Sequence, residues 1–496
     1  MNERNSYIAS GADKSLIWLW FILSAIGVMS IFSATYHDGD NVLQGFLSLK
    51  TDYSRQALFF VISGIAGIFI LLTDSKFFTA TANLWYAFGI LLMLLVFPFH
   101  SNIKGTSSII KLGSAVQIQP ADICKIFVNL ALAKYLSRVE TNFSKPRSQL
   151  IAVVIALVPA ALSIMQKETG LALVYFSFFL VMFREGLPPL VLIIGFSFAV
   201  LVVATLLLDP NVLALILTAI AGLFIYFFRS KIKRQRTVLF AIISIWFVCV
   251  GVQRFMVPFV FDHVFQPYQV KRIYDAIGKD YVPKSAAAAK EIEEKSVGKK
   301  KDNGDYNVKQ SKIAISNGGL LGKGLLKGTQ TRYDFVPEQR TDFIFCTIGE
   351  GFGFLGSVVF LSIYIILLLR IVTIAERQRS VFSRAYAYGV ASVFFFHISI
   401  NVCMTIGLAP VIGIPLPFVS YGGTSLLTFS VMLFILARLD ADRQMVPAVV
   451  WKYKSRSIRV FIPTLILLYC YTLILLQLIP LLHEDNPIVR RRIYDR

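Results

Sequence analysis

The most prominent pattern in the chain is a series of long apolar runs separated by short polar connectors. Each run is near or above the length of helix, about 20 residues, that crosses a ~30 Å hydrocarbon core. The runs are continuous and do not alternate at every second residue, so they predict helices rather than the strands of a barrel. The predicted spans are 15–34, 56–73, 82–99, 118–137, 149–165, 168–184, 188–208, 212–228, 237–257, 351–373, 385–409, 420–438 and 459–482. We therefore predict an all-α, polytopic integral membrane protein with about 10 to 13 transmembrane helices.

Composition supports a membrane protein and argues against other classes. The 496 residues are 56% hydrophobic and 16% charged, whereas a soluble domain has about 45–50% apolar and about 25% charged residues. The formal net charge of +20 falls mostly in short connectors, which is the positive-inside pattern and not the signature of a nucleic-acid-binding protein. The five cysteines form no CxxC pair, so neither a zinc site nor a disulfide framework is indicated. The first apolar run has no A-x-A cleavage site, so we expect a retained helix and not a signal peptide.

The connectors also predict an orientation. The basic loops at 229–236, 376–384 and 452–459 fall on one side if every span crosses, and that side is the cytoplasm, with the N-terminus inside. The long hydrophilic segment then lies outside, where ATP is absent, so chemistry there needs a pre-activated substrate. Its Lys/Ala/Glu-rich part, 279–305, is predicted to be a mobile insertion. The resulting division is 1–257 with about nine spans, the loop 258–350, the core helices 351–440, and an extra helix and tail at 441–496.

One acidic motif stands where the polar loop turns into an apolar run. Pro337 suits a first helical turn, and Glu338 and Asp342, four residues apart, would share a helix face. A carboxylate that is about to enter lipid is costly unless it is paired or serves a purpose. The plain alternative is a helix-start carboxylate paired with Arg340, because acidic residues at helix N-termini are ordinary.

Other polar groups occur at or within the predicted spans. The run 318–324 is not a phosphate loop, since Lys323 is followed by Gly324; it predicts tight turns, or backbone amides and Lys323 near an anionic headgroup. His397 and Asn401 lie at i and i+4 and face one way. Each such group is more often a satisfied packing or capping group than a ligand. Residues 413–425 form a Gly/Pro-rich non-helical stretch at membrane depth, which implies a pocket open to the outside. The remaining polar sets are Gln117, Gln119, Asp122 and Lys125 around Pro120, and Gln166, Lys167, Glu168 and Thr169.

Together these motifs resemble the SEDS family of shape, elongation, division and sporulation proteins, which polymerise peptidoglycan from lipid II. The Gly328-Thr329-Gln330 triplet is more similar to the RodA branch than to FtsW. The chain departs from the family pattern at four places: Ala121-Asp122 where it has Ser-Glu, Lys167-Glu168 where it has Pro-Asp, Arg340 where it has His, and 105–109, where its Gly-Ala-Arg-Arg-Trp element is barely visible. The family has ten spans, so this chain would add two before the large loop and one at its C-terminus. The matching segments are 310–315, 318–324 with 328–330, 337–345 and 407–425, together with 267–269 and Arg272.

The resemblance implies an inverting glycosyltransferase that extends β-1,4-linked glycan strands from lipid II during cell elongation, in the bacterial cytoplasmic membrane with its catalytic face outside. It makes Asp342 the candidate catalytic base, while Lys125 with Arg340 or Lys323 would compensate the diphosphate charge. A divalent cation, Mg²⁺ or Mn²⁺, could share that task, although no ligand cluster indicates one. The implied substrate-binding residues are Gln119, Asp122, Lys125, Glu168, Tyr268, Gln269, Arg272, Gln310, Ser311, Lys323, Glu338, Arg340, His397, Asn401 and Ser420.

The same resemblance implies partners. These are a class B penicillin-binding protein that cross-links the strands, other membrane proteins of the elongation complex, and membrane lipid. The rival hypothesis is a flippase for lipid-linked precursors, for which many spans and intramembrane polar groups are equally natural. A flippase, however, has no need of one essential carboxylate outside, so the two hypotheses differ at Asp342.

Overall fold

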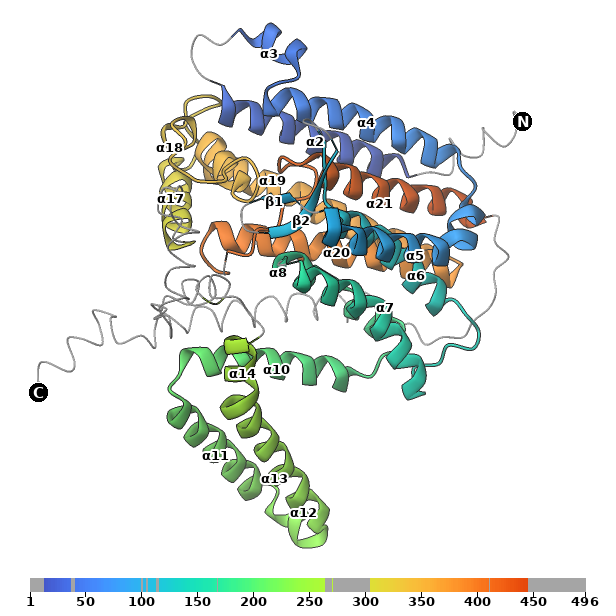
Figure 1. Ribbon diagram of the computed structural model, residues 1–496, viewed down its shortest axis with the longest axis vertical. Coiled ribbons are helices and arrows are strands. Elements are labelled where there is room, and N and C mark those ends of the chain that lie inside the picture. The colour runs from blue at the N-terminus through green and yellow to red at the C-terminus, as the bar shows by residue number, and fades with distance from the viewer. Residues whose placement is uncertain are drawn as a thin grey trace, which may run out of the picture. The chain divides into compact units, whose positions relative to one another are not determined.

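The protein is a multi-pass membrane protein built almost entirely of helices (Figure 1). The computed structural model describes residues 13–36, 41–99, 101–103, 106–112, 116–166, 168–263, 270, 304–409 and 411–444. Within these ranges, nine helices are long and apolar enough to cross a membrane. They are Lys14–Thr35, Asp52–Leu72, Ser75–Phe99, Pro146–Met165, Pro210–Phe227, Arg236–Phe261, Ile344–Arg377, Val381–Thr405 and Gly423–Ala441.

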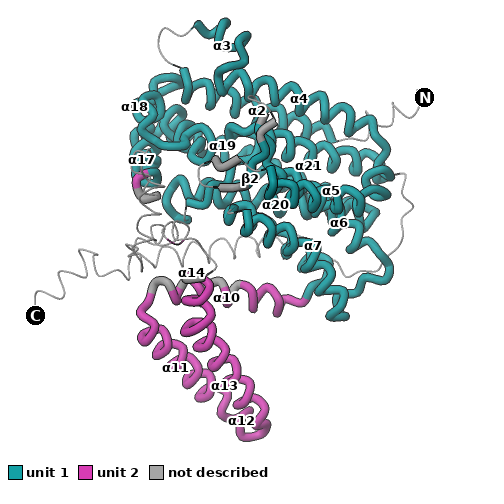
Figure 2. Tube along the Cα trace, viewed as in Figure 1, with its two compact units in different colours: residues 1–187, 307–496 teal, residues 188–306 magenta. Residues whose placement is uncertain are grey.

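The chain divides into two compact units (Figure 2), of which the first comprises residues 1–187 and 307–496. In this unit α20 and α21 form the centre, because 78% and 83% of their most apolar windows are buried inside the protein. Around them α4 packs on α21, α6 on α5 and α20, and α2 on α19. The helices of this unit are α2 (Lys14–Thr35), α3 (Val42–Ser48), α4 (Asp52–Leu72), α5 (Ser75–Phe99), α6 (Pro120–Leu136), α7 (Pro146–Met165), α8 (Thr169–Tyr175), α9 (Phe178–Arg184), α17 (Gly304–Asn317), α18 (Thr329–Arg332), α19 (Ile344–Arg377), α20 (Val381–Thr405), α21 (Gly423–Ala441) and the 3₁₀ turn η2 (Asp442–Gln444).

The second unit comprises residues 188–306 and is a helical hairpin with flanking helices (Figure 2). Its two apolar arms pack on each other and bury only 6% of their most apolar windows. Their side chains are left for lipid, as expected of membrane helices with few protein neighbours. The basic residues of the segment 229–236 lie at the tip of this hairpin. Its elements are α10 (Pro189–Leu207), α11 (Pro210–Phe227), α12 (Arg229–Arg234), α13 (Arg236–Gly251), the π-helical turn η1 (Val252–Met256) and α14 (Val257–His263).

Local sequence explains where several helices begin. Asp13 caps α2 by accepting a hydrogen bond from the Ser15 backbone N–H at 3.1 Å. Pro120, Pro146 and Pro210 each stand in the first turn of a helix, where a missing N–H costs nothing. Every predicted span up to residue 441 is occupied by helix, which confirms the all-α membrane fold. The predicted last span, 459–482, lies outside the described residues.

The structure corrects three expectations. The predicted span 168–184 is two short helices, α8 and α9. Helix α19 begins at Ile344 and not at 351, and it contains a break at Gly353, where φ is +65°. Its first turns are rich in glycine and carry Glu350, which lowered their apparent hydrophobicity. A small antiparallel sheet, β1 (Ser101–Ile103), β2 (Thr106–Leu112) and β3 (Val116–Ile118), precedes α6, although no strand was predicted.

Candidate active site

Asp342 lies in a series of turns just before α19, and the helix face predicted for Glu338 and Asp342 does not exist. Residues 337–343 are turns, because Glu338 adopts a left-handed φ of +54° and the helix starts only at Ile344. Three consecutive amides, those of Thr341, Asp342 and Phe343, donate to the Glu338 carbonyl at 3.1–3.2 Å. This compact turn leaves Asp342 half-buried and Glu338 exposed.

The non-helical stretch predicted at 413–425 is confirmed over residues 413–422, whereas 423–425 are helical and begin α21. The non-helical segment, 411–422, packs against the Asp342 turn. The Tyr421 amide donates to the Arg340 carbonyl at 2.8 Å. The Ser420 hydroxyl donates to the Thr341 carbonyl at 2.5 Å. Asn401, buried on α20, donates to the Asp342 carbonyl at 2.9 Å and to the Ile414 carbonyl at 2.7 Å. The turn that carries the acidic motif is thus fixed to the C-terminal core.

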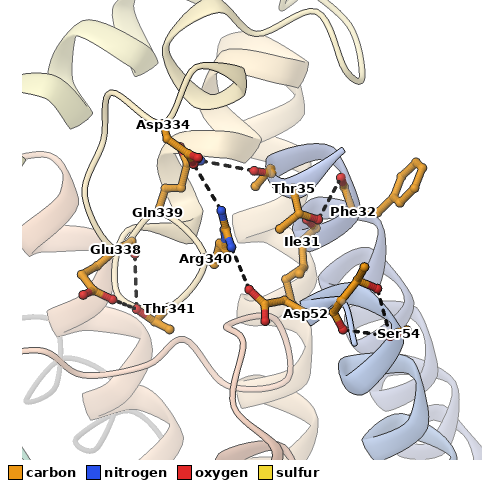
Figure 3. Close-up of polar contacts among 12 residues, drawn as sticks. Ile31, Phe32, Thr35, Asp52, Ser54, Asp334, Glu338, Gln339, Arg340 and Thr341 are labelled. Carbon is orange, nitrogen blue, oxygen red and sulfur yellow. Dashed lines mark hydrogen bonds and ion pairs between the residues drawn. The ribbon is translucent and has the colours of Figure 1, made fainter. Parts of the chain in front are cut away.

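Arg340 pairs with carboxylates other than those of its own motif. It reaches Asp52 at the start of α4, at 2.8 Å, and Asp334 at 3.4 Å (Figure 3). Desolvation alone would lower the pKa of Arg340, but hydrogen bonds and charge from Asp52 and Asp334 raise it above its ordinary value. The neighbouring Gln339 is buried and donates to the Ala34 and Thr331 carbonyls at 3.3 and 2.7 Å. These contacts tie the turn to α2 and α4.

A second polar group is buried between α6 and α20. The Lys125 ammonium lies 2.6 Å from an Asp122 carboxylate oxygen and 3.0 Å from His397 Nε2. His397 Nδ1 lies 3.0 Å from the Pro415 carbonyl. A carbonyl can only accept, so Nδ1 carries the hydrogen and Nε2 accepts from Lys125. His397 and Asn401 therefore face one way, as predicted, and both contact the 411–416 segment.

The glycine-rich run forms tight turns against α19. The amides of Lys323 and Gly324 donate to the Glu350 and Gly351 carbonyls at 3.1 and 2.8 Å. Glu350 is fully buried, and its carboxylate accepts from the Gln330 and Thr331 amides at 3.0 and 2.9 Å and from Lys323 at 3.3 Å. The predicted close approach of backbone to backbone is therefore present.

The remaining predicted residues are distributed around these groups. Glu168 is half-buried and accepts from Ser108 of the small sheet at 2.6 Å. Ser311 is buried and donates to the Thr405 carbonyl at 2.9 Å, whereas Gln310 and Gln119 are half-buried. Tyr268, Gln269 and Arg272 lie outside the described residues, as does the predicted insertion except for its last two residues, which begin α17.

Sequence reasoning missed several residues of the site. Gln56 on α4 donates to the Ser420 carbonyl at 3.3 Å and accepts from the Gly422 amide at 3.2 Å. Asp52, Gln339 and Glu350 were likewise not singled out. A polar residue within or at the start of an apolar run was the available signal for Gln56 and Glu350, because such residues are costly in lipid.

The described residues do not offer a ready-made metal site. No group of three or more His, Cys, Asp or Glu side chains among them could hold a metal ion. This finding concerns dedicated protein cages, whereas a Mg²⁺ ion that is held by one or two carboxylates and a substrate phosphate needs no such group.

Comparison with known proteins places this arrangement in a family. The family model of the FtsW, RodA and SpoVE proteins, described as cell cycle proteins, matches residues 13–221 and 189–445. This chain belongs to that family. The two matched segments overlap over 189–221, which covers α10 and much of α11. This overlap fits a chain that carries additional helices in this region.

Curated relatives cover most of the chain. It is 30% identical over 457 residues to the peptidoglycan glycosyltransferase RodA of Treponema pallidum, across 87% of this chain and 98% of that protein. It is 30% identical over 360 residues to the peptidoglycan glycosyltransferase MrdB of Escherichia coli K12, across 73% and 78% of the two chains.

Solved structures share the fold at lower identity. A chain of a peptidoglycan synthase complex that coordinates polymerization and crosslinking matches with a TM-score of 0.58 and 20% identity, over 88% of this chain and 99% of that one. The crystal structure of the Thermus thermophilus rod shape determining protein RodA matches with a TM-score of 0.53 and 20% identity, over 87% and 97%. Both likenesses support the fold described above.

Proposed function

We propose that this protein is a peptidoglycan glycosyltransferase of the RodA type, which polymerises lipid II into β-1,4-linked glycan strands. The proposal rests on its family and on its relatives, which are named peptidoglycan glycosyltransferases. The observation that carries the mechanism is the half-buried Asp342, set on a turn that is fixed to the core on both sides. A rigidly placed carboxylate is what a general base requires. The relatives' names favour this function over the flippase alternative.

The proposed chemistry needs few protein groups. Asp342 accepts the proton of the acceptor 4-hydroxyl while that oxygen attacks the anomeric carbon of the donor, and the diphosphate leaves with the bonding electron pair. One displacement inverts an α-linked donor to a β-linked product, so no covalent enzyme intermediate is required. Positive charge near the diphosphate stabilises the leaving group.

We assign that positive charge to Arg340 and Lys323. Their side chains keep 34% and 30% of their surface exposed, whereas Lys125 has none exposed. Contact between Lys125 and a diphosphate would require the Asp122–Lys125–His397 group to open. We therefore propose that Lys125 stabilises the buried Asp122–Lys125–His397 group without contacting the donor, and that Arg340, two residues from Asp342, faces the donor diphosphate.

We further propose the cellular setting implied by the family. The protein would lie in the bacterial cytoplasmic membrane with its N-terminus inside and Asp342 outside. A class B penicillin-binding protein would cross-link the strands, within a complex of other elongation proteins. The structural neighbour from a complex that couples polymerization with crosslinking supports such a partner. A divalent cation, Mg²⁺ or Mn²⁺, would be shared between the donor diphosphate and one or two carboxylates, as is usual for Mg²⁺.

The test is polymerisation of lipid II by the purified protein. Asp342→Asn preserves the volume but removes the base, so the rate should fall about 10²–10⁴-fold, with thermal stability near that of the wild type. Glu140→Gln, an exposed site beyond the far end of α6, is the matched control and should polymerise normally. Normal glycan synthesis by Asp342→Asn would exclude Asp342 as the base.

A further inference from the structure

Three consecutive carbonyl groups of the Asp342 turn are each held by a donor from the C-terminal core. Arg340 O accepts from the Tyr421 amide, Thr341 O from the Ser420 hydroxyl and Asp342 O from the Asn401 amide, at 2.8, 2.5 and 2.9 Å. We call these three hydrogen bonds the carbonyl clamp. We infer that the clamp, and above all its bond from Asn401, positions the Asp342 carboxylate for the reaction. The inference deepens the proposed function and rests on it.

The clamp fixes the backbone around Asp342, which no helix or strand fixes. Residues 337–343 lie outside any helix, so the regular hydrogen bonds of α19 do not fix their backbone. Asn401 has no exposed surface, and it stands on α20, one of the most buried helices. Loss of this buried amide removes a rigid donor from both carbonyls that it binds, at a cost in free energy. A water molecule that entered the space left behind would not be attached to α20. The backbone position of Asp342 thus depends on the side chain of Asn401, 59 residues further along the chain.

Asn401 also sets the opposite wall of the Asp342 environment. Its second bond, to the Ile414 carbonyl at 2.7 Å, fixes the segment that carries Gly413. A Cβ atom at Gly413 would lie 3.3 Å from Asp342 Oδ2, closer than most Cβ contacts, and its φ of +74° favours glycine. The Asn401 amide therefore holds both the backbone of Asp342 and the segment with Gly413, which faces the Asp342 carboxylate. Both neighbours are carbonyls, which identifies the bonding end of Asn401 as its NH₂ group.

Ser420 adds a second link of the same kind. Its hydroxyl donates to Thr341 O and accepts from the Leu416 amide at 2.8 Å, so it also couples the acidic turn to the 411–422 segment. Gln56 holds that segment from α4 through Ser420 O and Gly422 N. The family resemblance implied that Asn401 and Ser420 bind substrate. Their burial and their bonds to backbone assign them to positioning instead.

The experiment compares Asn401→Ala with Ser392→Ala as a matched control. Ser392 is equally buried on the same helix, and its hydroxyl has no hydrogen-bond partner among the described residues. Asn401→Ala should lower kcat for lipid II polymerisation about 10²-fold, as expected for a misplaced catalytic group, with KM nearly unchanged. Ser392→Ala should leave kcat unchanged. In an Asp342→Asn background, Asn401→Ala should cause little further loss, because residues that act as a unit are not additive.

A second measurement does not depend on activity. Hydrogen exchange followed by mass spectrometry should show faster exchange in peptides that contain Leu416 and Tyr421 in Asn401→Ala, since the Tyr421 amide donates to Arg340 O within the clamp and the Leu416 amide donates to Ser420, a clamp residue. Ser392→Ala should leave these peptides protected. Two results would overturn the positioning role of Asn401. One is an unchanged exchange rate in Asn401→Ala, and the other is an equal fold-loss of kcat on adding Asn401→Ala to the wild type and to Asp342→Asn. Full activity of Asp342→Asn would instead refute the base assignment, while the exchange result would still decide whether Asn401 holds the segment.

Discussion

The buried Asp122–Lys125 pair offers a quantitative test of the core. Both side chains are almost completely excluded from solvent, and their charged atoms lie 2.6 Å apart. Lys125→Met keeps the length of the side chain and removes the charge, which leaves the Asp122 carboxylate buried without its counter-ion. Removing one member of a buried pair typically destabilises a protein by about 3–5 kcal/mol. We expect a loss of this size in the free energy of unfolding.

A second substitution separates charge from packing. Adding Asp122→Asn to Lys125→Met removes the stranded carboxylate and should restore most of the lost free energy. The deficit that stays should be about 1–3 kcal/mol, because His397 Nε2 has lost the ammonium that donates to it. The coupling free energy from this double-mutant cycle should therefore be large and favour the intact pair.

The assay is reversible unfolding in mixed detergent micelles, with each variant at the same protein and detergent concentrations. Lys134→Met is the matched control, since Lys134 stands on the same helix at a partly exposed site and donates to the Ala80 carbonyl at 2.8 Å. Its loss should cost about 1 kcal/mol or less. If the double variant were less stable than Lys125→Met by the full cost of Asp122→Asn alone, the two residues would be independent and the reasoning would be wrong.

Two further predictions concern orientation and pH. Single cysteines at Ser230 and Ser296, in a background without native cysteines, should label oppositely with an impermeant maleimide in intact cells, because the basic tip at 229–236 is expected inside and the long loop outside; equal labelling would contradict the span count. Burial alone would raise the pKa of Asp13, but hydrogen bonds and charge from Arg370 and Arg377 lower it below its ordinary value of 3.8. The ionised Asp13 therefore stabilises the fold above pH 3.8, and this stabilisation is lost as the pH falls through the lowered pKa. Asp13→Asn keeps a capping side chain, and its deficit in unfolding free energy relative to wild type should be full at pH 6–7 and shrink below about pH 3.8; a deficit independent of pH would show that the charge is not responsible.

The sequence by itself determined the helices and the acidic motif. A long apolar run in lipid must satisfy its own backbone, so helix formation follows from the run whatever lies beside it. Each predicted span from 15–34 to 420–438 accordingly contains helix in the structure, although the span 168–184 is two short helices and α21 begins only at Gly423. Asp342 could be singled out because a carboxylate next to an apolar run is costly, and the family resemblance supplied its implied role.

Only the tertiary structure decided which polar groups meet. His397 and Asn401 share a face by their spacing, yet nothing local indicates that His397 contacts Lys125, 272 residues earlier, or that Asn401 contacts Asp342. The predicted helix over Glu338 and Asp342 failed for the same reason. Its backbone carbonyls bond to Ser420, Tyr421 and Asn401, and these long-range bonds fix a turn where local propensity suggested a helix. Periodicity gives the direction of a side chain, whereas a hydrogen bond needs a partner within about 3 Å, and the packing of distant helices supplies that partner.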